Sequence, residues 1–262
     1  MIGGSSLTER GALFPAELPV HFSRVPPGPD TAHLITWWWM SEWNLPPGQE
    51  SAQEVLSFPA SNLVFEPEGV RYWGPTTRRS TRILSGRGWV LGALLKPAAV
   101  PLFTDHPSEV RDEFLVVNAP EILATVRGNA ADLTASVTHV EGWLAAQTGP
   151  VSDEARLANR LAEIAIRDSA ITSVADLAQA LDISTRTVNR LTAKYVGLSP
   201  YAMIRRRRLQ EAVAWTREHP QDALADIAAQ FGFADQAHLS HEARTLLGFT
   251  LTDYRSRAAH PR

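Results

Sequence analysis

Residues 173–205 read SVADLAQALDISTRTVNRLTAKYVGLSPYAMIR, and residues 223–255 read ALADIAAQFGFADQAHLSHEARTLLGFTLTDYR. The first stretch contains Ala175-Asp176-Leu177-Ala178 and the second Ala225-Asp226-Ile227-Ala228, and Gly197 aligns with Gly248. Self-similarity at a fixed spacing, here about 50 residues, indicates a repeated structural unit. Each copy has a short segment with helical apolar spacing, a tight turn, and a second such segment that begins at a capping residue. The sequence therefore predicts two helix-turn-helix units, a plan whose second helix enters the DNA major groove.

The second helix of the first copy is expected to begin after Ser184, which can cap it, and to end near Gly197. Its apolar positions face inward, so its other side chains are available to DNA. Arg and Asn are the residue types that pair bidentately with guanine and adenine. The candidate DNA-binding residues of this helix are Thr185, Arg186, Asn189, Arg190 and Lys194.

The second helix of the second copy is expected to follow Asp235 and to end near Gly248, with Leu239 and Leu246 facing inward. Its candidate DNA-binding residues carry less positive charge than those of the first copy. We therefore expect the first unit to supply most of the base specificity and the second to set the register. The candidates in the second copy are Gln236, Ala237, Ser240, His241 and Arg244.

A long helix is expected between the two copies, from Tyr201 to about Glu218, with Asp222 capping the helix that follows. The linking helix contains four consecutive arginines, Arg205–Arg208, which point around its whole circumference. We therefore expect one or two of them to reach DNA phosphate and the others to pair with acidic residues or face solvent.

The motifs ADLAQALDISTRTVNRL, VGLSPYAMIRRRRLQEA and ALADIAAQFGFADQAHLSHEARTLLGFT resemble the C-terminal domain of AraC/XylS-family transcription regulators. The resemblance implies two helix-turn-helix units on one long helix, reading successive major grooves of double-stranded DNA. Four positions depart from the family pattern: Thr192 and Ala243 replace Phe, His241 replaces a frequent Arg, and Leu251 replaces a frequent Pro. The base-reading positions that the resemblance implies are Arg186, Asn189, Arg190, Gln236, Ala237, Ser240 and His241.

The N-terminal half has the texture of an antiparallel β domain, with short apolar runs bounded by Gly and Pro from Thr31 to about Val100. The preceding residues are rich in Gly, Ser and Pro and predict a loosely ordered lead-in with one or two extended pieces. The expected fold class is therefore α+β in two domains, with a β barrel or sandwich followed by helices. The N-terminal half also resembles an uncharacterised sensor-type domain found with AraC-type domains, through WWWMSEW, EVLSFPASNLVFE and TRILSGRGWVLGALLKPAAVPLF.

Six of the eight tryptophans fall in the β segment, and three of them, Trp37–Trp39, are consecutive. Alternation along a strand sends consecutive side chains to opposite faces, so this strand needs apolar cover on both sides. The aromatic residues can form a pocket for an apolar or planar effector, or they can simply be a core, which is the more common use. The candidate effector residues are Trp37, Trp39, Trp73 and Trp89.

Arginines scattered over the same segment can line an anion site or form the solvent face of a hairpin, and the second use is the more common. They are Arg71, Arg78, Arg79, Arg82 and Arg87.

Helical spacing resumes after residue 97, and Ser152 is positioned to cap a helix whose narrow seam is Leu157, Leu161 and Ile164. This seam can pair with a second subunit or lie on the β domain. The expected domains are residues 1–150 for the β-rich sensor or dimerisation domain, 151–170 for a linker helix, and 171–262 for the DNA-binding domain.

The composition limits the classes of function. The chain has 262 residues and no cysteine, which excludes thiol catalysis and disulfides. The net charge of −3 conceals a C-terminal third that is locally basic, as expected of a nucleic-acid binder. No apolar run is long enough to span a bilayer, so we expect a cytoplasmic protein without membrane contact.

The eight histidines show no tight metal-ligand spacing, and no glycine-rich phosphate loop is present, so no metal, cofactor or catalytic residue is expected. The leading hypothesis is a sequence-specific transcription regulator, not an enzyme, controlled by a small-molecule effector or by homodimerisation. An activating or repressing role and contact with RNA polymerase stay open. The alternatives are an enzyme domain joined to a DNA-targeting tail and an effector-independent architectural DNA binder.

Overall fold

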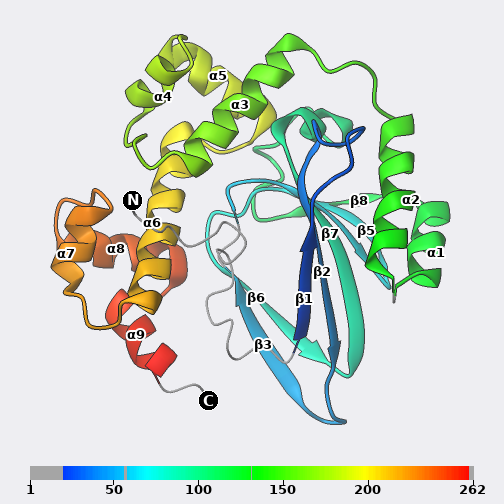
Figure 1. Cartoon of the computed structure of the whole chain (residues 1–262), viewed down its shortest axis with the longest axis horizontal. Helices are drawn as coiled ribbons and strands as arrows, with labels where there is room; N and C mark the ends of the chain where they lie inside the picture. The colour runs from blue at the N-terminus through cyan, green and yellow to red at the C-terminus, as the bar shows by residue number, and fades with distance from the viewer. Residues whose placement is uncertain (1–19, 56–57, 131, 260–262) are drawn as a thin grey trace.

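The structure is a computed structural model of the chain, and it describes residues 20–55, 58–130 and 132–259 (Figure 1). A β-rich half is joined through α3 to a helical half, which stands beside it in Figure 1. The predicted α+β class with an N-terminal antiparallel β domain and a C-terminal helical domain is confirmed. Most of the predicted Gly- and Pro-rich lead-in lies outside the described residues, but its last part contains the strand β1 (Val20–Val25).

Six antiparallel strands form one sheet in the order β1-β2-β7-β4-β5-β8. These strands are β1, β2 (Ile35–Asn44), β7 (Arg87–Leu95), β4 (Asn62–Glu66), β5 (Gly69–Trp73) and β8 (Phe114–Val117). A separate two-stranded ribbon pairs β3 (Glu50–Val55) with β6 (Ser80–Ser85). The sheet is open at β1 and β8, so the expectation of a closed barrel is wrong.

The three consecutive tryptophans of β2 alternate between the two faces of this sheet, as predicted. Trp38 is fully buried in the core beneath α2, where its indole Nε1 donates to Glu141 Oε1 at 2.9 Å. Trp39 lies on the opposite face across β7, directly over Gly92. A Cβ on Gly92 would come within 2.2 Å of the Trp39 ring, so only glycine fits there.

Helices cover the core face of the sheet. A 3-10 segment, η2 (Pro97–Leu102), follows β7, and α1 (Pro120–Gly128) and α2 (Leu133–Ala146) pack on the sheet after β8 (Figure 1). Their apolar side chains, among them Ile122, Val126 and Val140, join strand residues in one core. Burial of this continuous apolar surface stabilises the β domain.

The helical half contains two cores, one for each copy of the repeated pattern. The first unit is α4 (Val174–Ala180) with α5 (Thr185–Tyr195), and the second is α7 (Leu224–Gln230) with α8 (Gln236–Leu247). The long α6 (Pro200–Glu218) joins them, and α9 (Leu251–Ala259) completes the second core. Leu251, which replaces the family's frequent Pro, is buried in this second core.

The linker helix α3 (Asp153–Arg167) packs within the chain. Leu161 is buried in the core of the first unit, together with four alanines of α3. The same helix contacts the β domain, because Asn159 accepts from the Ala98 backbone N–H and donates to His33 O, both at 2.8 Å. The seam was expected to pair with a second subunit or to lie on the β domain, but Leu157, Leu161 and Ile164 pack on the core of the first helix-turn-helix unit instead.

Most of the expected helix caps are present. Ser152, Ser184, Ser199 and Asp235 each accept from a backbone N–H of the first turn that follows. The expectation that Asp222 caps the seventh helix is wrong. The N-cap of α7 is Ala223, which cannot make a side-chain bond, while Asp222 accepts the Trp215 indole N–H at 2.9 Å.

Candidate DNA-binding surface and interdomain cavity

Helix α5 presents a polar outer face. Its apolar residues Val188, Leu191 and Tyr195 are buried, as predicted, and Ser184 caps its start. Thr185, Arg186 and Asn189 are exposed near that start. None of the described residues forms an ion pair with Arg186, so its guanidinium is available to an incoming base or phosphate.

Arg190 and Lys194 lie on the same face of α5, one turn apart, and both contact Glu154 in the first turn of α3. Glu154 Oε2 pairs with Arg190 Nη1, and Glu154 Oε1 lies 2.6 Å from Lys194 Nζ. The Tyr195 hydroxyl also donates to Oε1 at 3.1 Å. Hydrogen bonds from Lys194 and Arg190 lower the pKa of Glu154 to about 2, and the same contact raises the pKa of Lys194.

Helix α8 presents the second polar face. Asp235 accepts from the His238 backbone N–H at 2.7 Å, and Gly248 ends the helix in the left-handed conformation at φ 81°. Of the predicted residues, Gln236, Ala237, His241 and Arg244 are exposed and Ser240 is half-buried. The neighbouring Glu242 is buried and pairs with Arg205 of α6.

The four consecutive arginines of α6 contact different parts of the chain. Arg205 pairs with Glu242, and Arg206 donates to Thr76 Oγ1 of the β domain at 3.1 Å. Arg207 donates to the carbonyls of Asp168 and Ile171, which precede α4. Arg208 donates to the carbonyls of Phe231 and Gly232, at the end of α7.

Burial separates two of the four arginines of α6 from DNA. Arg206 and Arg207 are only 2% and 1% exposed. The sequence predicted that one or two of the four arginines reach DNA phosphate and that the others pair with acidic residues or face solvent. Arg206 and Arg207 are too buried to reach phosphate or solvent. Burial also lowers the pKa of Arg206 to about 10.

The β domain docks against the second unit on the side away from the outer face of α8. The Arg79 backbone N–H donates to Leu246 O at 2.8 Å, and the Arg79 guanidinium lies 2.9 Å from Glu54 Oε1. Glu54 also contacts Arg257 of α9 at 3.3 Å, and both arginines lie over the ring of Phe249. These contacts fix the orientation of the second unit relative to the ribbon.

The scattered arginines of the β domain also have structural partners. Arg71 and Arg82 both pair with Glu66, which is buried at 3% exposure between them. With Arg79 bound to Glu54, three of the five arginines expected to line an anion site or face solvent are instead paired within the chain.

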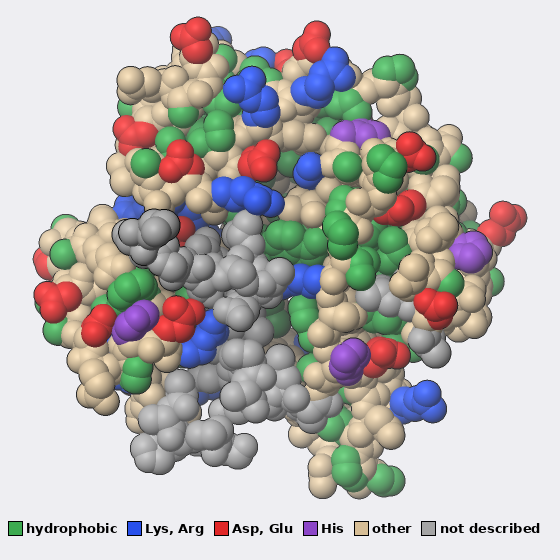
Figure 2. Space-filling view, viewed as in Figure 1, with side chains coloured by type: hydrophobic (Ala, Val, Ile, Leu, Met, Phe, Trp, Pro, Cys, Tyr) green, Lys and Arg blue, Asp and Glu red, His purple; other side chains and the backbone are tan. Residues whose placement is uncertain are grey.

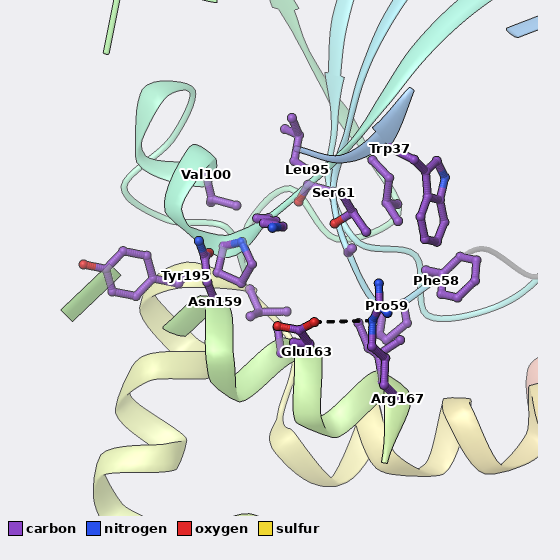
Figure 3. Close-up of a pocket in the computed structure, with 18 residues that line it drawn as sticks. Trp37, Phe58, Pro59, Ser61, Leu95, Val100, Asn159, Glu163, Arg167 and Tyr195 are labelled. Atoms are coloured by element: carbon purple, nitrogen blue, oxygen red, sulfur yellow. Dashed lines mark ion pairs between the residues drawn. The ribbon is translucent and has the colours of Figure 1, made fainter. Parts of the chain in front are cut away.

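A cavity of about 110 Å³ lies between the β domain and α3 (Figure 3). Trp37, Phe58 and Leu95 line one side, and Asn159, Glu163 and Arg167 project from α3 on the other. Its walls reach Tyr195 and Val196 at the end of α5. The cavity therefore touches the β domain, the linker helix and the first unit.

The four tryptophans predicted to bind an effector do not come together. Only Trp37 lines the cavity. Trp39 stacks on Phe22 and donates to Asn62, and Trp73 packs on Phe114 at the far end of the sheet. Trp89 is half-buried against the core of the β domain. The interpretation of these rings as one pocket is wrong, because the sheet register separates them.

The polar groups of the cavity were not anticipated from the sequence. Lys96 is half-buried, its Nζ donates to Ala32 O at 2.6 Å, and burial lowers its pKa. Figure 3 shows the ion pair between Glu163 and Arg167. With Lys96 and Arg167 positive and Glu163 negative, the lining carries one net positive charge.

The surface over the first unit is mixed in charge. In Figure 2, acidic and basic side chains are interspersed over the part of the molecule where Figure 1 places α3, α4 and α5. DNA binding at this unit therefore depends on which individual cations face the duplex, because no large patch of one sign covers it.

Family comparisons agree with this arrangement. Residues 177–257 match the family described as a helix-turn-helix domain, and residues 23–115 match a domain of unknown function (DUF6597). Two such units on one connecting helix, with polar outer faces on their second helices, define a DNA-binding protein. The helix-turn-helix region is of the AraC type, and the chain is a DNA-binding transcription regulator of that type. No functionally curated protein matches the chain significantly.

The solved structures that the chain matches include those of two other proteins, ToxT and CuxR. ToxT from Vibrio cholerae O395 is 11% identical over 92% of this chain and 98% of its own, with a TM-score of 0.42. ToxT from strain SCE256 bound to an unsaturated fatty acid is 12% identical over 90% and 94%, with a TM-score of 0.39. The AraC-like transcriptional activator CuxR is 14% identical over 77% and 89%, with a TM-score of 0.23. These values are too low to transfer any geometry to this chain.

Two features are absent from residues 20–55, 58–130 and 132–259. No helix there is both long and apolar enough to cross a membrane. No group of three or more His, Asp or Glu side chains there is arranged to hold a metal ion.

Proposed function

We propose that α5 and α8 are the two recognition helices, that they read base sequence in successive major grooves, and that a small ligand in the interdomain cavity controls this binding. One observation carries the first part. Both helices are capped at their start, bury an apolar face and leave polar side chains exposed. Residues near the start of a recognition helix are those that reach base edges.

The two helices are assigned different shares of the recognition. Arg186 and Asn189 lie near the start of α5 and have the side chains best suited to guanine and adenine. Gln236 and His241 of α8 carry no fixed positive charge, so α8 contributes mainly to the register of the complex. Arg190, Lys194 and Arg244 supply contacts to phosphate or to base edges.

The test compares Arg186→Ala with Arg87→Ala, which removes the same charge from an exposed position of the β domain. The wild-type protein first selects its preferred duplex from a random library, and each variant is then titrated with that duplex and with random DNA at one salt concentration. Arg186→Ala should lower the specific-to-random affinity ratio by about tenfold or more, and Arg87→Ala should leave it unchanged. An unchanged ratio for Arg186→Ala would remove the basis for α5 as a base-reading helix.

The second part of the proposal concerns the ligand. Apolar walls and one net positive charge favour a monoanion with an apolar body, such as a small carboxylate. The cavity sets the scale of the apolar body, since an engineered apolar cavity of about 150 Å³ binds benzene. Because α3 carries five of the lining residues and packs on α5, a ligand there contacts the element that joins the two domains.

Thermal unfolding with benzoate and hexanoate, and with their uncharged amides, tests this site. A ligand at about ten times its dissociation constant should raise the melting temperature by about 2–4 °C. The carboxylates should give this rise, the amides a smaller one, and Arg167→Gln should remove it. Arg160→Gln, at an exposed position of the same helix outside the cavity lining, is the control. Equal responses to acids and amides, or no response to either acid, would count against a carboxylate effector.

Homodimerisation, contact with RNA polymerase, a cytoplasmic location and the absence of catalysis remain predictions. They follow from the class of regulator and from the sequence features given above. Sedimentation of the protein alone and with its selected duplex would decide the first of them.

A further inference from the structure

Glu154 lies outside both helix-turn-helix units, yet its carboxylate contacts three side chains of the first recognition helix. It pairs with Arg190, lies 2.6 Å from Lys194 Nζ, and accepts from the Tyr195 hydroxyl at 3.1 Å. Arg190 and Lys194 remain about half exposed, at 54% and 53% of their side chains. The Glu154 carboxylate therefore contacts Arg190 and Lys194 from the side of α3, while the rest of both side chains is open to solvent.

We propose that Glu154 is an intramolecular competitor of DNA phosphate for Arg190 and Lys194, and that it sets the DNA affinity of the first unit. This inference rests on the proposed role of α5 in binding DNA. A carboxylate offers the same kind of charge-assisted acceptor that a phosphate offers. A DNA phosphate must therefore displace the Glu154 carboxylate from Arg190 and Lys194. Arg186 forms no ion pair among the described residues, so a phosphate that binds it displaces no carboxylate.

Three physical features suit Glu154 to this role. Hydrogen bonds from Lys194 and Arg190 lower its pKa to about 2, so the competing charge is present throughout the neutral range. Ion pairs between partly exposed side chains contribute little to folding stability, so the contact can open without unfolding the unit. Its negative charge also opposes the approach of DNA, because DNA affinity depends on the number of phosphates that are neutralised.

Helix α3, which carries Glu154, bridges the first unit and the β domain. It shares the core of the first unit, which holds Glu154 against α5. One and a half turns further along α3, Asn159 bonds to the backbone of Ala98 and His33, and Glu163 and Arg167 line the interdomain cavity. This connects the cavity to the affinity of the first unit through a single helix.

The experiment compares Glu154→Gln with Asp153→Asn in the full-length protein. Asp153 is the neighbouring acid on the same turn, 97% exposed, and it pairs with Arg156 of its own helix rather than with α5. Both variants remove one negative charge from the first turn of α3, and both should keep the wild-type melting curve. The selected duplex is titrated over a range of salt concentrations.

Glu154→Gln should bind about three- to tenfold more tightly, and its salt dependence should steepen by about one phosphate equivalent or more. Asp153→Asn should change the affinity by less than about twofold. The gain should disappear when Glu154→Gln is combined with Lys194→Ala and Arg190→Ala.

Equal or weaker binding by Glu154→Gln, with a specific-to-random ratio that still depends on Arg186, would overturn the competitor role and leave the proposed function standing. An equal gain in Asp153→Asn would also overturn it, because the effect would then be general electrostatics. Loss of all dependence on Arg186 would instead contradict the proposed function itself.

Discussion

The two helix-turn-helix units are similar in sequence but are connected to the rest of the chain in different ways. The first unit shares its core with α3, and Glu154 of that helix engages the outer face of α5. The second unit leaves the outer face of α8 accessible and is docked from another side by Arg79 and Glu54 of the β domain. The two units therefore share the same kind of buried interior and differ in which parts of the chain contact them. On our proposal, Glu154 adjusts the DNA affinity of the first unit, whereas contacts from the β domain fix the orientation of the second.

The largest difference between the units should be in stability, at two neighbouring arginines of α6. Arg207 is 1% exposed and donates to two carbonyls beside the first unit, whereas Arg208 is half-buried and donates to two carbonyls of the second unit. Arg207→Ala should lower the free energy of unfolding by about 3 kcal/mol, because it leaves buried carbonyls without a donor. Arg208→Ala should cost about 1 kcal/mol. Urea denaturation measures both, and equal losses would show that the units do not differ in this respect.

The next effect concerns DNA recognition. Arg190→Ala should weaken binding to the selected duplex by about 1–3 kcal/mol, and His241→Ala by less than about 1 kcal/mol, because an imidazole lacks the guanidinium fork with which arginine binds guanine or phosphate bidentately. Gel-shift titration at one salt concentration compares them, with circular dichroism as the control for folding. Equal losses would mean that α8 contributes more than its side chains indicate.

A smaller difference lies in the caps of the first helix of each unit. Ser173 and Asp176 form a capping box at α4, while Ala223 begins α7 in an extended conformation without any side-chain cap. Ser173→Ala should destabilise the protein by about 1 kcal/mol, and Ala223→Ser should stabilise it by about 0.5–1 kcal/mol. Thermal unfolding of both variants would show whether the caps really differ, since no gain from Ala223→Ser would mean that its backbone N–H groups are already satisfied.

The smallest effect should be a dependence of stability on pH at the capping box of α4 in the first unit. Hydrogen bonds from Thr172 and Ser173 lower the pKa of Asp176 to about 2. Because the folded pKa is below the ordinary value of about 3.9, the contribution to stability is complete above about pH 4 and is lost as the pH falls toward 2. Asp176→Asn should flatten the acid limb of the stability curve between these values. A curve unchanged from wild type would assign the acid sensitivity to other carboxylates.

Local signals in the sequence predicted the helical half well. Caps, apolar spacing and the terminal glycines all act within one turn, so Ser173, Ser184 and Asp235 could be assigned from neighbouring residues alone. The prediction that Asp222 caps α7 failed because the Asp222 carboxylate accepts a hydrogen bond from the indole N–H of Trp215, seven residues earlier. A contact of that kind depends on side-chain direction, which spacing does not specify.

The site was harder to predict because its residues come from distant parts of the chain. Glu154 precedes Arg190 by 36 residues, and no periodic pattern connects them. The cavity combines strands, η2, α3 and α5, so its lining depends on how two domains pack. The tryptophans of β2 were equally hard to place from the sequence. Alternation along the strand predicted that they lie on opposite faces of the sheet, but it did not predict that Gly92 of a neighbouring strand leaves room for the Trp39 ring.

The four arginines of α6 make this helix a rigid spacer. Arg206 binds the β domain, Arg207 binds the residues before the first unit, and Arg205 and Arg208 bind the second unit. Neither unit can therefore rotate about the helix axis without breaking contacts of Arg207 or Arg208. A helix of 19 residues spans about 28 Å, close to the rise of one turn of B-DNA. One base pair inserted between the two half-sites turns the second site by about 35°. A spacer that cannot twist cannot follow this turn, so if α5 and α8 read successive grooves as proposed, we expect binding to depend on the spacing of the half-sites as well as on their sequence.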